Sequence, residues 1–511
     1  QVAAPYPVRT WQQTLVRLQG QTAIPVAPPA GALPGTAALQ ATFASTLVGS
    51  LDGVRRAMRA YPYSCLEQQV SRAVVLDDPQ AVLPRLGGYQ DADGLLRFWP
   101  CECHGYDMLT SYVLTVAHEA GWTVPGMVRQ RALDGLRAFV EGRLVRGSVL
   151  QAPDETLRKL AALAALARYG QASRAMLDAL LIDPALLPTS AVLNWLEVTG
   201  RLEGYPQATR QAVLQMLRSR LDMGGARLGL VNEDQEHLHW LLLSPDAAAA
   251  HLLALVAAEP SWQEDAPRLA RGLLDRQVRG QWDITTANAW GVLALRRFAQ
   301  HFEQQAPTGA SHVILGARHH VVNWQPPTGQ KTETEVHWPL ASPDTLRLLH
   351  LGAGAPWVTL SSLAARRLDH EVRSGYVIAR TVTAVERRDP NAWHVGDVLR
   401  VRLVIRATSD MAYVVVADPI PSGATILGGV HRAGLLESGE RTEGVWPAYE
   451  ERTFTAYRAY FDVLPQGDQV VEYTMRLNQS GRFQLPGSRV EAMYAPERYA
   501  ELPGSALVVL P

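Results

Sequence analysis

Two side chains that can react with each other stand three residues apart near the start of the chain. The stretch "YPYSCLEQQV" at positions 61–70 places Cys65 three residues before Gln68. Pro62 and the apolar spacing of "LEQQVSRAVVL" predict a helix that begins at Cys65, so residues 65 and 68 share one helical face. Backbone N–H groups and the helix dipole favour a thiolate at such a position. Cys65 is therefore predicted to be a nucleophile beside a primary amide.

The chemistry open to this pair is the formation of an internal thioester. Attack of the Cys65 thiolate on the Gln68 carboxamide would expel ammonia and leave an acyl-thioester closed within one helical turn. That bond lasts only where apolar walls exclude water and amines. Two other interpretations stand beside it: a buried, unreactive Cys65, and a catalytic Cys65 with a His base. The histidines available as that base are His104, His118, His237, His239 and His251.

The other two cysteines lie in the stretch "CECH" at positions 101–104. A total of three cysteines leaves at least one outside any intramolecular disulfide. Cys101 and Cys103 could form a strained disulfide in an oxidising compartment or remain two thiols. A metal site is the weakest interpretation, because the second spaced pair of ligands that a closed zinc site needs is missing. We expect no metal and no cofactor.

Length and charge limit the classes of protein to consider. The 511 residues exceed what one hydrophobic core usually serves, so two or three domains are expected. Lys plus Arg number 48 against 49 for Asp plus Glu, which gives no global field that favours nucleic acid or an anionic membrane. No run of about 18 apolar residues predicts a membrane-spanning helix. The opening "QVAAPYPVRT" has neither Met nor a signal-peptide pattern, so we expect a piece of a longer protein.

The pattern of apolar residues changes twice along the chain. Residues 1–50 carry short extended pieces separated by "APPAGALPG". Residues 51–305 show three- and four-residue spacing, for example in "TLRKLAALAALARYG", which predicts a stack of helices. From 306 onward the period approaches two, with a break near residue 374 that separates a shorter β segment from a β-sandwich at 375–511. The helical spacing leaves open whether the helices form a solenoid or a closed α/α toroid.

The stretch "YPYSCLEQQVSRA" closely resembles the thioester segment of the bacterial α2-macroglobulins. In that family the Cys and Gln of a C-x-E-Q motif form an internal thioester, which here implies a bond between Cys65 and Gln68. Leu66 then occupies the variable position and Glu67 the motif glutamate. Nearly the whole chain is covered, because other stretches resemble the family too: "LGGYQDADGLLRFW", "MLTSYVLTVAHEAGW", "GQWDITTANAWGVLALRRFAQHFE" and "EAMYAPERYAELPG".

The resemblance implies a multidomain α plus β fold. An α/α toroid thioester domain at 51–305 would be inserted in a CUB-like β domain made of residues 1–50 and 306–374. A C-terminal macroglobulin-like β-sandwich at 375–511 would follow. The chain would be the C-terminal part of a protein whose other macroglobulin-like domains and protease-bait region lie upstream.

The implied function is that of a broad-spectrum endopeptidase inhibitor in bacterial defence, with a single-turnover thioester and no catalytic cycle. Bait cleavage would expose the thioester, and lysine amines of the protease would attack it and become covalently attached. Residues matching the family's shield over the thioester are Tyr61, Tyr63, Met493 and Tyr494. Some relatives pass the acyl group through a histidine, for which His237 and His239 are candidates. The periplasm is the expected compartment, with any lipid anchor at an N-terminus outside this chain.

Two other classes of function are retained as alternatives. An α/α toroid is also the fold of terpenoid cyclases and some glycosidases, and such an enzyme would need paired carboxylates in a central cavity. Asp77 with Asp78, and Asp91 with Asp93, are the neighbouring acids, although the chain has no D-x-D-D sequence. The last alternative is a scaffold or adhesin without a thioester.

Overall fold

The computed structural model describes residues 8–222, 227–231, 233–324, 334–428 and 445–511. The chain divides into two compact units. The larger unit consists of Val8–Gly147 and Pro153–Arg366, and the smaller one is built from Arg367–Pro511 together with the segment Ser148–Ala152. In the part of the chain that is described, no helix has both the length and the apolar character needed to cross a membrane.

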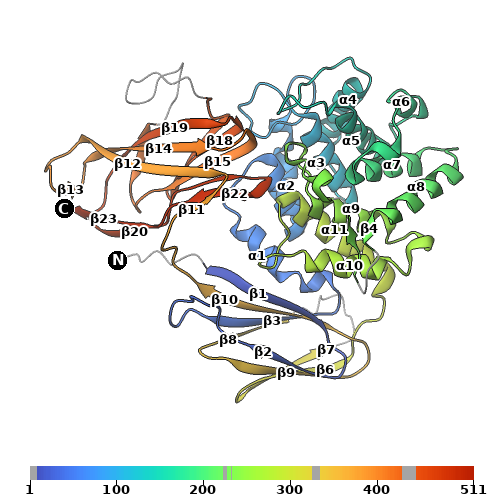
Figure 1. Ribbon diagram of the computed structural model, residues 1–511, viewed down its shortest axis with the longest axis horizontal. Helices are drawn as coiled ribbons and strands as arrows, with labels where there is room; N and C mark the ends of the chain where they lie inside the picture. Colours follow the sequence, from blue (N-terminus) through green and yellow to red (C-terminus); the bar gives the residue numbers. More distant parts are fainter. Residues whose placement is uncertain (1–7, 223–226, 232, 325–333, 429–444) are drawn as a thin grey trace. The chain divides into compact units, whose positions relative to one another are not determined.

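Six helices of the larger unit form a closed ring (Figure 1). Each packs against the next in the order given, and the last packs back against the first. The arrangement is therefore a toroid, which settles the alternative that helical spacing left open. The ring helices are α2 (Leu66–Leu76), α3 (Asp107–Glu119), α5 (Glu155–Arg168), α7 (Thr189–Arg201), α9 (Pro245–Val256) and α11 (Thr285–Phe302).

A second layer of helices packs on the outside of this ring. Amphipathic spacing explains the layer: in one outer helix the buried residues 266, 269, 270 and 273 follow the i, i+3, i+4, i+7 pattern of a single apolar face. Ring helices such as α3 and α9 are buried almost all round. The outer helices are α1 (Asp52–Ala60), α4 (Gly126–Val140), α6 (Arg174–Asp178), α8 (Gln207–Ser219) and α10 (Ala266–Asp275). Short connecting elements are η1 (Val48–Ser50), η2 (Pro79–Ala81), η3 (Leu83–Tyr89), η4 (Pro184–Leu186), η5 (Glu233–Glu236), η6 (His239–Leu241), η7 (Pro260–Trp262), β4 (Leu221–Asp222) and β5 (Gly229–Leu230).

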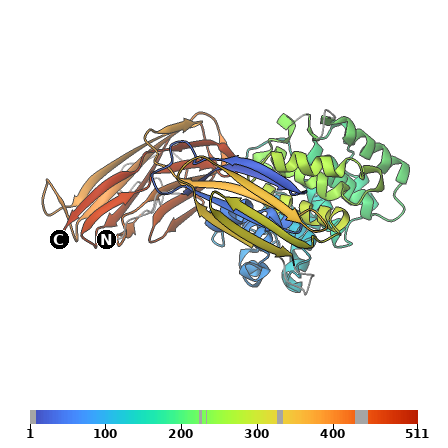
Figure 2. The same ribbon diagram turned by 90° about the horizontal axis from the view of Figure 1, so that it is seen from below.

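Two four-stranded antiparallel sheets complete the larger unit, and both combine strands from before and after the helices. Blue and gold strands accordingly lie side by side in Figures 1 and 2. The first sheet has the order β1 (Val8–Arg17), β10 (Trp357–Ala365), β3 (Ala38–Ala44), β8 (Thr334–Pro339). The second has the order β2 (Gln21–Val26), β9 (Asp344–Leu351), β6 (Gly309–Leu315), β7 (Arg318–Trp324). Their apolar side chains, Phe43, Leu346 and Val358 among them, share one core. The helices are thus inserted into a β domain, as the resemblance implied.

One carboxylate joins the two points where the chain passes between this β domain and the helices. Glu303, at the C-terminal end of α11, accepts the Leu47 N–H at 2.8 Å and the Trp357 indole N–H at 2.5 Å. The Thr359 hydroxyl donates to the Ser50 carbonyl at 2.7 Å. Burial raises the pKa of Glu303. The start and the end of the inserted segment are therefore held to the same strands.

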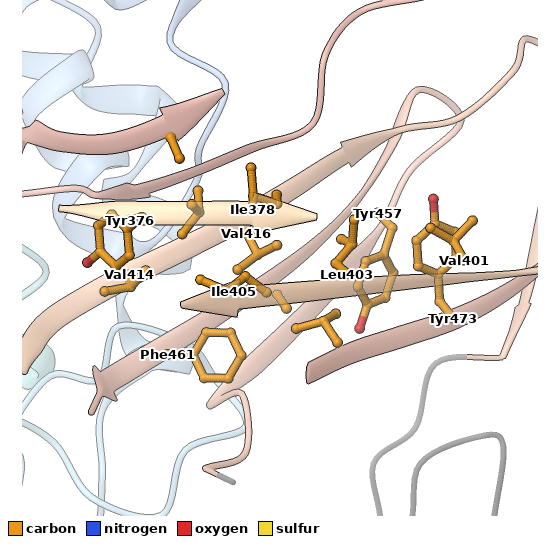
Figure 3. Close-up of a cluster of buried hydrophobic side chains, with 14 of the residues drawn as sticks. Tyr376, Ile378, Val401, Leu403, Ile405, Val414, Val416, Tyr457, Phe461 and Tyr473 are labelled. Atoms are coloured by element: carbon orange, nitrogen blue, oxygen red, sulfur yellow. The ribbon is translucent and has the colours of Figure 1, made fainter. Parts of the chain in front are cut away.

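The smaller unit is a β-sandwich whose core is shown in Figure 3. The inner face of the sandwich is formed by apolar side chains that alternate with polar ones along each strand. In β14, for example, Leu399, Val401, Leu403 and Ile405 are buried and the residues between them are more exposed. One sheet has the order β11 (Val372–Ser374), β22 (Ala495–Glu501), β21 (Arg489–Ala492), β15 (Met411–Pro419), β18 (Ala456–Leu464), β17 (Tyr449–Arg452). The others are β12 (Tyr376–Glu386), β14 (Val398–Ala407), β19 (Gly467–Arg476), β16 (Thr425–Gly428), and β13 (Trp393–His394), β23 (Ser505–Leu510), β20 (Gly481–Leu485).

Candidate functional site

The segment that carries Cys65 is a short connection between two helices. Helix α1 ends at Ala60, and Tyr61 is extended (φ −62°, ψ 121°), as expected for the residue before a proline. Cys65 is the N-cap of α2, with φ −63° and ψ 165°. The prediction that this thiol stands at a helix N-terminus is confirmed.

The structure brings the side chains of Cys65 and Gln68 together at the first turn of α2. The Cys65 backbone N–H donates to Oε1 of Gln68 at 3.1 Å, so the carboxamide folds back over the helix start. The Gln68 backbone N–H is in turn directed at the Cys65 side chain, which is the reciprocal arrangement of a capping box. Both residues are 1% exposed. The two groups therefore meet in a site from which bulk water is excluded.

This geometry suits attack of sulfur on the carboxamide carbon. Negative charge would develop on Oε1 of Gln68, and that oxygen already accepts the Cys65 N–H. The N-terminal end of α2 adds a positive helix dipole at the same place. The Leu66 N–H, which also belongs to this turn, donates to the Phe98 carbonyl at 3.0 Å and fixes the helix start against the neighbouring loop.

The motif residue Glu67 points into the helical ring and is fully buried. The Thr285 hydroxyl of α11 lies 2.9 Å from both carboxylate oxygens, and the Ser71 hydroxyl donates to Oε1 at 2.5 Å. Ser71 is also 2.5 Å from the Tyr112 hydroxyl of α3. Because Ser71 has one proton and gives it to Glu67, Tyr112 donates to Ser71. We call Glu67, Ser71, Tyr112 and Thr285 the Glu67 cluster; it fixes α2 to α3 and α11.

Electrostatics keep the Glu67 cluster in this hydrogen-bonding pattern. Burial, together with the neighbouring charge of Glu67, raises the pKa of Tyr112 well above its usual value, so the phenol keeps its proton. Sequence analysis missed Ser71, Tyr112 and Thr285. The spacing of Glu67 and Ser71, four residues apart on one helix, was a readable signal, whereas Thr285 lies 218 residues away.

The two tyrosines predicted as shields lie on the connection before Cys65. Their rings meet edge to face, with centroids 5.5 Å apart and planes at 89°. Tyr63 is buried and Tyr61 half-buried. The Gln69 amide holds this connection by donating to the Ser64 carbonyl at 2.6 Å. The segment therefore has a defined conformation beside the thiol.

The other two predicted shields belong to the smaller unit. Met493 and Tyr494 are both buried, between β21 and β22. The Met493 N–H donates to the Tyr413 carbonyl at 3.0 Å, and the rings of Tyr413 and Tyr494 meet edge to face at 5.3 Å. Tyr413 has a positive φ of 54°, which is unfavourable for an aromatic residue and needs support from its surroundings. The role of Met493 and Tyr494 as a shield stays a prediction.

Cys101 and Cys103 are both exposed thiols in the loop before α3. Partial burial raises the pKa of the Cys101 thiol. The Arg97 guanidinium donates to the Glu102 carbonyl at 2.8 Å and shapes this loop. A disulfide between the two cysteines stays a prediction. Within the described residues, no group of three or more His, Cys, Asp or Glu side chains is arranged to hold a metal ion.

The histidines proposed as bases occupy different surroundings. His104, His118 and His237 are exposed, and His118 lies 3.9 Å from Glu119. His239 meets the ring of Trp240 edge to face at 5.2 Å. His251 is buried on α9, within the ring of helices. Their roles in acyl transfer stay predictions.

The neighbouring acids singled out for a toroid enzyme have structural partners. Asp77 ends α2 and lies 3.4 Å from Arg296, while Asp78 accepts the Ala81 N–H. Asp91 accepts two backbone N–H groups and pairs with Arg146, which also pairs with Asp93. As far as the chain is described, the cavity inside the ring has no Asp or Glu in its lining. The paired carboxylates that a cyclase or glycosidase needs are not brought together there.

Comparison with known proteins gives concordant matches. Residues 375–497 match the family model of the bacterial alpha-2-macroglobulin MG10 domain. An alpha-2-macroglobulin homolog from Nostoc sp. is 25% identical over 291 residues, which are 52% of this chain and 15% of that protein. The chain thus spans a minor part of that relative.

Two solved structures share the fold over nearly the whole chain. Native alpha-2-macroglobulin from Escherichia coli, spanning domain MG7 to the C-terminus, is 18% identical with a TM-score of 0.75 and covers 100% of this chain and 83% of that one. Salmonella alpha-2-macroglobulin reacted with methylamine is 20% identical with a TM-score of 0.72 and covers 98% and 34%. The predicted multidomain α plus β fold is confirmed, while the predicted domain boundaries stay predictions.

Proposed function

We propose that this chain is part of a protease inhibitor. Two findings support the proposal: residues 375–497 match the family model of the bacterial alpha-2-macroglobulin MG10 domain, and the whole chain has the fold of the C-terminal region of such a protein. Its reactive group is an internal thioester between Cys65 and Gln68. It acts once on each target and is not an enzyme. The resemblance drawn from the sequence is confirmed at the level of the family, and the chemistry is our proposal.

The observation that carries the proposal is the reciprocal contact between Cys65 and Gln68 at a buried helix start. In forming the thioester, the sulfur of Cys65 bonds to the carboxamide carbon of Gln68. The carbon–nitrogen bond breaks, the thiol proton passes to nitrogen, and ammonia leaves. The Cys65 N–H stabilises the oxygen that carries charge during this step.

Capture is the second half of the chemistry. A lysine amine of a bound protease attacks the acyl carbon of residue 68, the carbon–sulfur bond breaks, and Cys65 takes up a proton as a thiol. The product is an amide bond between residue 68 and the protease. Direct attack by the amine needs no histidine, so neither His237 nor His239 is required.

Protection of the bond before capture is assigned to aromatic side chains. Tyr61 and Tyr63 precede Cys65 and form an edge-to-face pair, which supports a shielding role. Met493 and Tyr494 form the other part of the proposed shield, supported by the family resemblance. A conformational change after bait cleavage would then expose the thioester.

The complete inhibitor includes parts outside this chain. The bait region and the remaining macroglobulin-like domains are its proposed partners within the same protein, and proteases are its covalent targets. We place it in the periplasm. No nucleic acid and no cofactor take part.

Mass spectrometry tests the thioester. The intact native chain is expected to weigh about 17 Da less than its sequence, because ammonia is lost when the bond forms. Cys65→Ala should restore the full mass, while Cys101→Ala with Cys103→Ala should keep the deficit. A full sequence mass, with Gln68 unchanged in peptide mapping, would contradict the proposal and favour the scaffold or adhesin. Glu at position 68 would instead indicate a thioester already hydrolysed.

A further inference from the structure

A cavity of about 60 Å³ lies inside the helical ring. Five ring helices contribute to its lining, from α3 through α11, together with the segment around η6. The side chains that line it include Tyr112, Leu157, Ser190, Asn194, His251 and Trp290. Leu157 and Asn194 are half-buried, whereas Ser190 and His251 are buried.

Two buried polar atoms in this lining have no hydrogen-bond partner among the described residues: Oγ of Ser190 and Nε2 of His251. The residues are 2% and 7% exposed. Buried polar groups in folded proteins nearly always have a partner, so each exception calls for a missing ligand or water. Both residues line the same cavity, so a single ligand is the simplest partner for both atoms.

The local structure explains why the Ser190 hydroxyl has no hydrogen-bond partner among the described residues. The hydroxyl of a serine at the N-cap of a helix normally accepts one of the first backbone N–H groups, but the N-cap of α7 is Pro188 and Ser190 is its second residue. In α7 that task falls to Glu236, whose carboxylate accepts the N–H groups of Thr189 and Ser190 at 2.5 and 3.0 Å. The Ser190 hydroxyl therefore has no capping role.

His251 also lines the cavity. Its ring stacks on the indole of Trp290, with centroids 4.3 Å apart and planes at 23°. Nε2 lies 3.7 Å from Oε1 of Glu197, beyond hydrogen-bond distance. Glu197 is itself paired with Arg168 at 3.1 Å. The stacking on Trp290 thus fixes the orientation of the imidazole beside the cavity.

The size and polarity of the cavity define the class of ligand. At about 10–15 Å³ for each water, the space corresponds to roughly four waters. The described lining has no Asp, Glu, Lys or Arg, so an ion would lack a counter-charge. Most of the wall is apolar, including Leu157 and the indole of Trp290. Waters that fill the cavity would lie against this apolar wall, where they find few hydrogen-bond partners.

We propose that this cavity is a binding site for a small neutral molecule with an apolar body and one hydroxyl group. The hydroxyl bonds to Ser190 and His251, and the apolar body lies against Trp290 and Leu157. The site is separate from Cys65 and Gln68, and it does not depend on whether those residues form a thioester.

Phenol and benzene are the probes that test this site, because they share an apolar ring and differ by one hydroxyl. Calorimetric titration and thermal unfolding of the 511-residue chain should show that phenol binds and raises the melting temperature. Benzene should bind at least about fivefold more weakly, the change expected for loss of one hydrogen bond. Equal binding of the two probes, or binding of neither, would overturn the proposal.

Variants locate the binding. Ser190→Ala should reduce the preference for phenol over benzene at least about threefold. Ser111→Ala is the matched control in the same lining, because the Ser111 hydroxyl already donates to the Asp107 carbonyl at 2.7 Å; the preference should persist. Ala161→Met, which fills the cavity from α5, should remove phenol binding. An unchanged preference in Ser190→Ala, or phenol binding that survives Ala161→Met, would place the ligand elsewhere and overturn the proposal.

Discussion

Each unit of the molecule contains a fully buried carboxylate that accepts hydrogen bonds from hydroxyl groups, and the two carboxylates have different roles. Asp418 of β15 pairs with Arg380 of β12 at 2.9 Å and accepts bonds from Tyr473 of β19 and Ser488. It therefore connects the six-stranded sheet, which contains β15, to the four-stranded sheet, which contains β12 and β19. Glu67 of α2 accepts bonds from Ser71 and Thr285 and, through Ser71, connects to Tyr112.

The difference lies in what surrounds each group. Asp418 accepts a hydrogen bond from Tyr473, a member of the apolar core shown in Figure 3, so its bonds stabilise the sandwich as a whole. Glu67 stands one residue from Gln68, so its bonds set the position of a reactive segment. A buried carboxylate with hydroxyl donors can thus stabilise the fold in one place and position the residues of a site in another. Mutations of the two carboxylates or their donors can distinguish these roles.

The largest effect is expected for Asp418→Ala. Removing this carboxylate leaves the half-buried Arg380 without its ion-pair partner and Tyr473 and Ser488 without their acceptor, which should lower the free energy of unfolding of the sandwich by about 3 kcal/mol or more. Hydrogen exchange measured by mass spectrometry should show faster exchange across residues 375–511. The control is Asp468→Asn, since Asp468 pairs with Arg406 on the surface, and no measurable change is expected. Equal effects of the two variants would break the comparison.

Thr285→Val should affect the reactive segment more than the fold. It removes a hydroxyl that donates to Glu67 while keeping the shape of the side chain, at a cost of about 1–3 kcal/mol. Fewer chains should then carry the thioester, which the methylamine-reactive fraction measures. Thr286→Val is the matched neighbour, because its hydroxyl donates to the Leu242 carbonyl instead. If both variants lower the reactive fraction equally, Glu67 has no special role in positioning.

Tyr112→Phe should have a smaller effect of the same kind. The phenol donates to Ser71 and reaches Glu67 only through that residue, so its loss should cost about 1 kcal/mol. Ser71 keeps its bond to Glu67, and the methylamine-reactive fraction should fall less than in Thr285→Val. A larger fall than in Thr285→Val would show that the assigned direction of the Ser71 hydrogen bonds is wrong.

A separate prediction concerns pH and Asp283, an acid that precedes α11. Burial and the neighbouring charge of Asp246 raise the pKa of Asp283 to about 7 from a usual value of 3.8. The folded state then holds a proton that the unfolded state releases, so stability of the ring should decrease as pH rises from about 4 to about 7. Urea unfolding followed by circular dichroism at several pH values measures this. Asp283→Asn should flatten the dependence; an unchanged slope would assign it to another group.

The local parts of this account could be predicted from the sequence. The spacing of Cys65 and Gln68 and the position of Pro62 predicted a shared helical turn, and the structure has that turn. Alternating apolar residues in "DVLRVRLVIRAT" predicted a strand with one buried face, which is β14. The insertion of helices between β strands came from the family resemblance, not from periodicity. Each of these features depends on neighbours in the chain or on a known relative.

The contacts that complete the site join distant parts of the chain, and one sequence carries no signal for them. Thr285 reaches Glu67 across 218 residues, and Glu303 meets Leu47 across 256. Closure of the ring likewise depends on α11 packing against α2. Residue type and spacing describe what a side chain can do, but only folding decides which distant group becomes its partner.

The most direct test of the central claim is peptide mapping of the native chain before and after treatment with methylamine. The account predicts that treatment leaves a methylamide at residue 68, about 14 Da heavier than glutamine, and releases one thiol at Cys65 in equal amount. Both changes should be absent from denatured controls in which the bond was first hydrolysed. A Cys65 thiol that reacts with an alkylating reagent before any amine is added, in chains whose Gln68 is intact and stays unmodified, would contradict it.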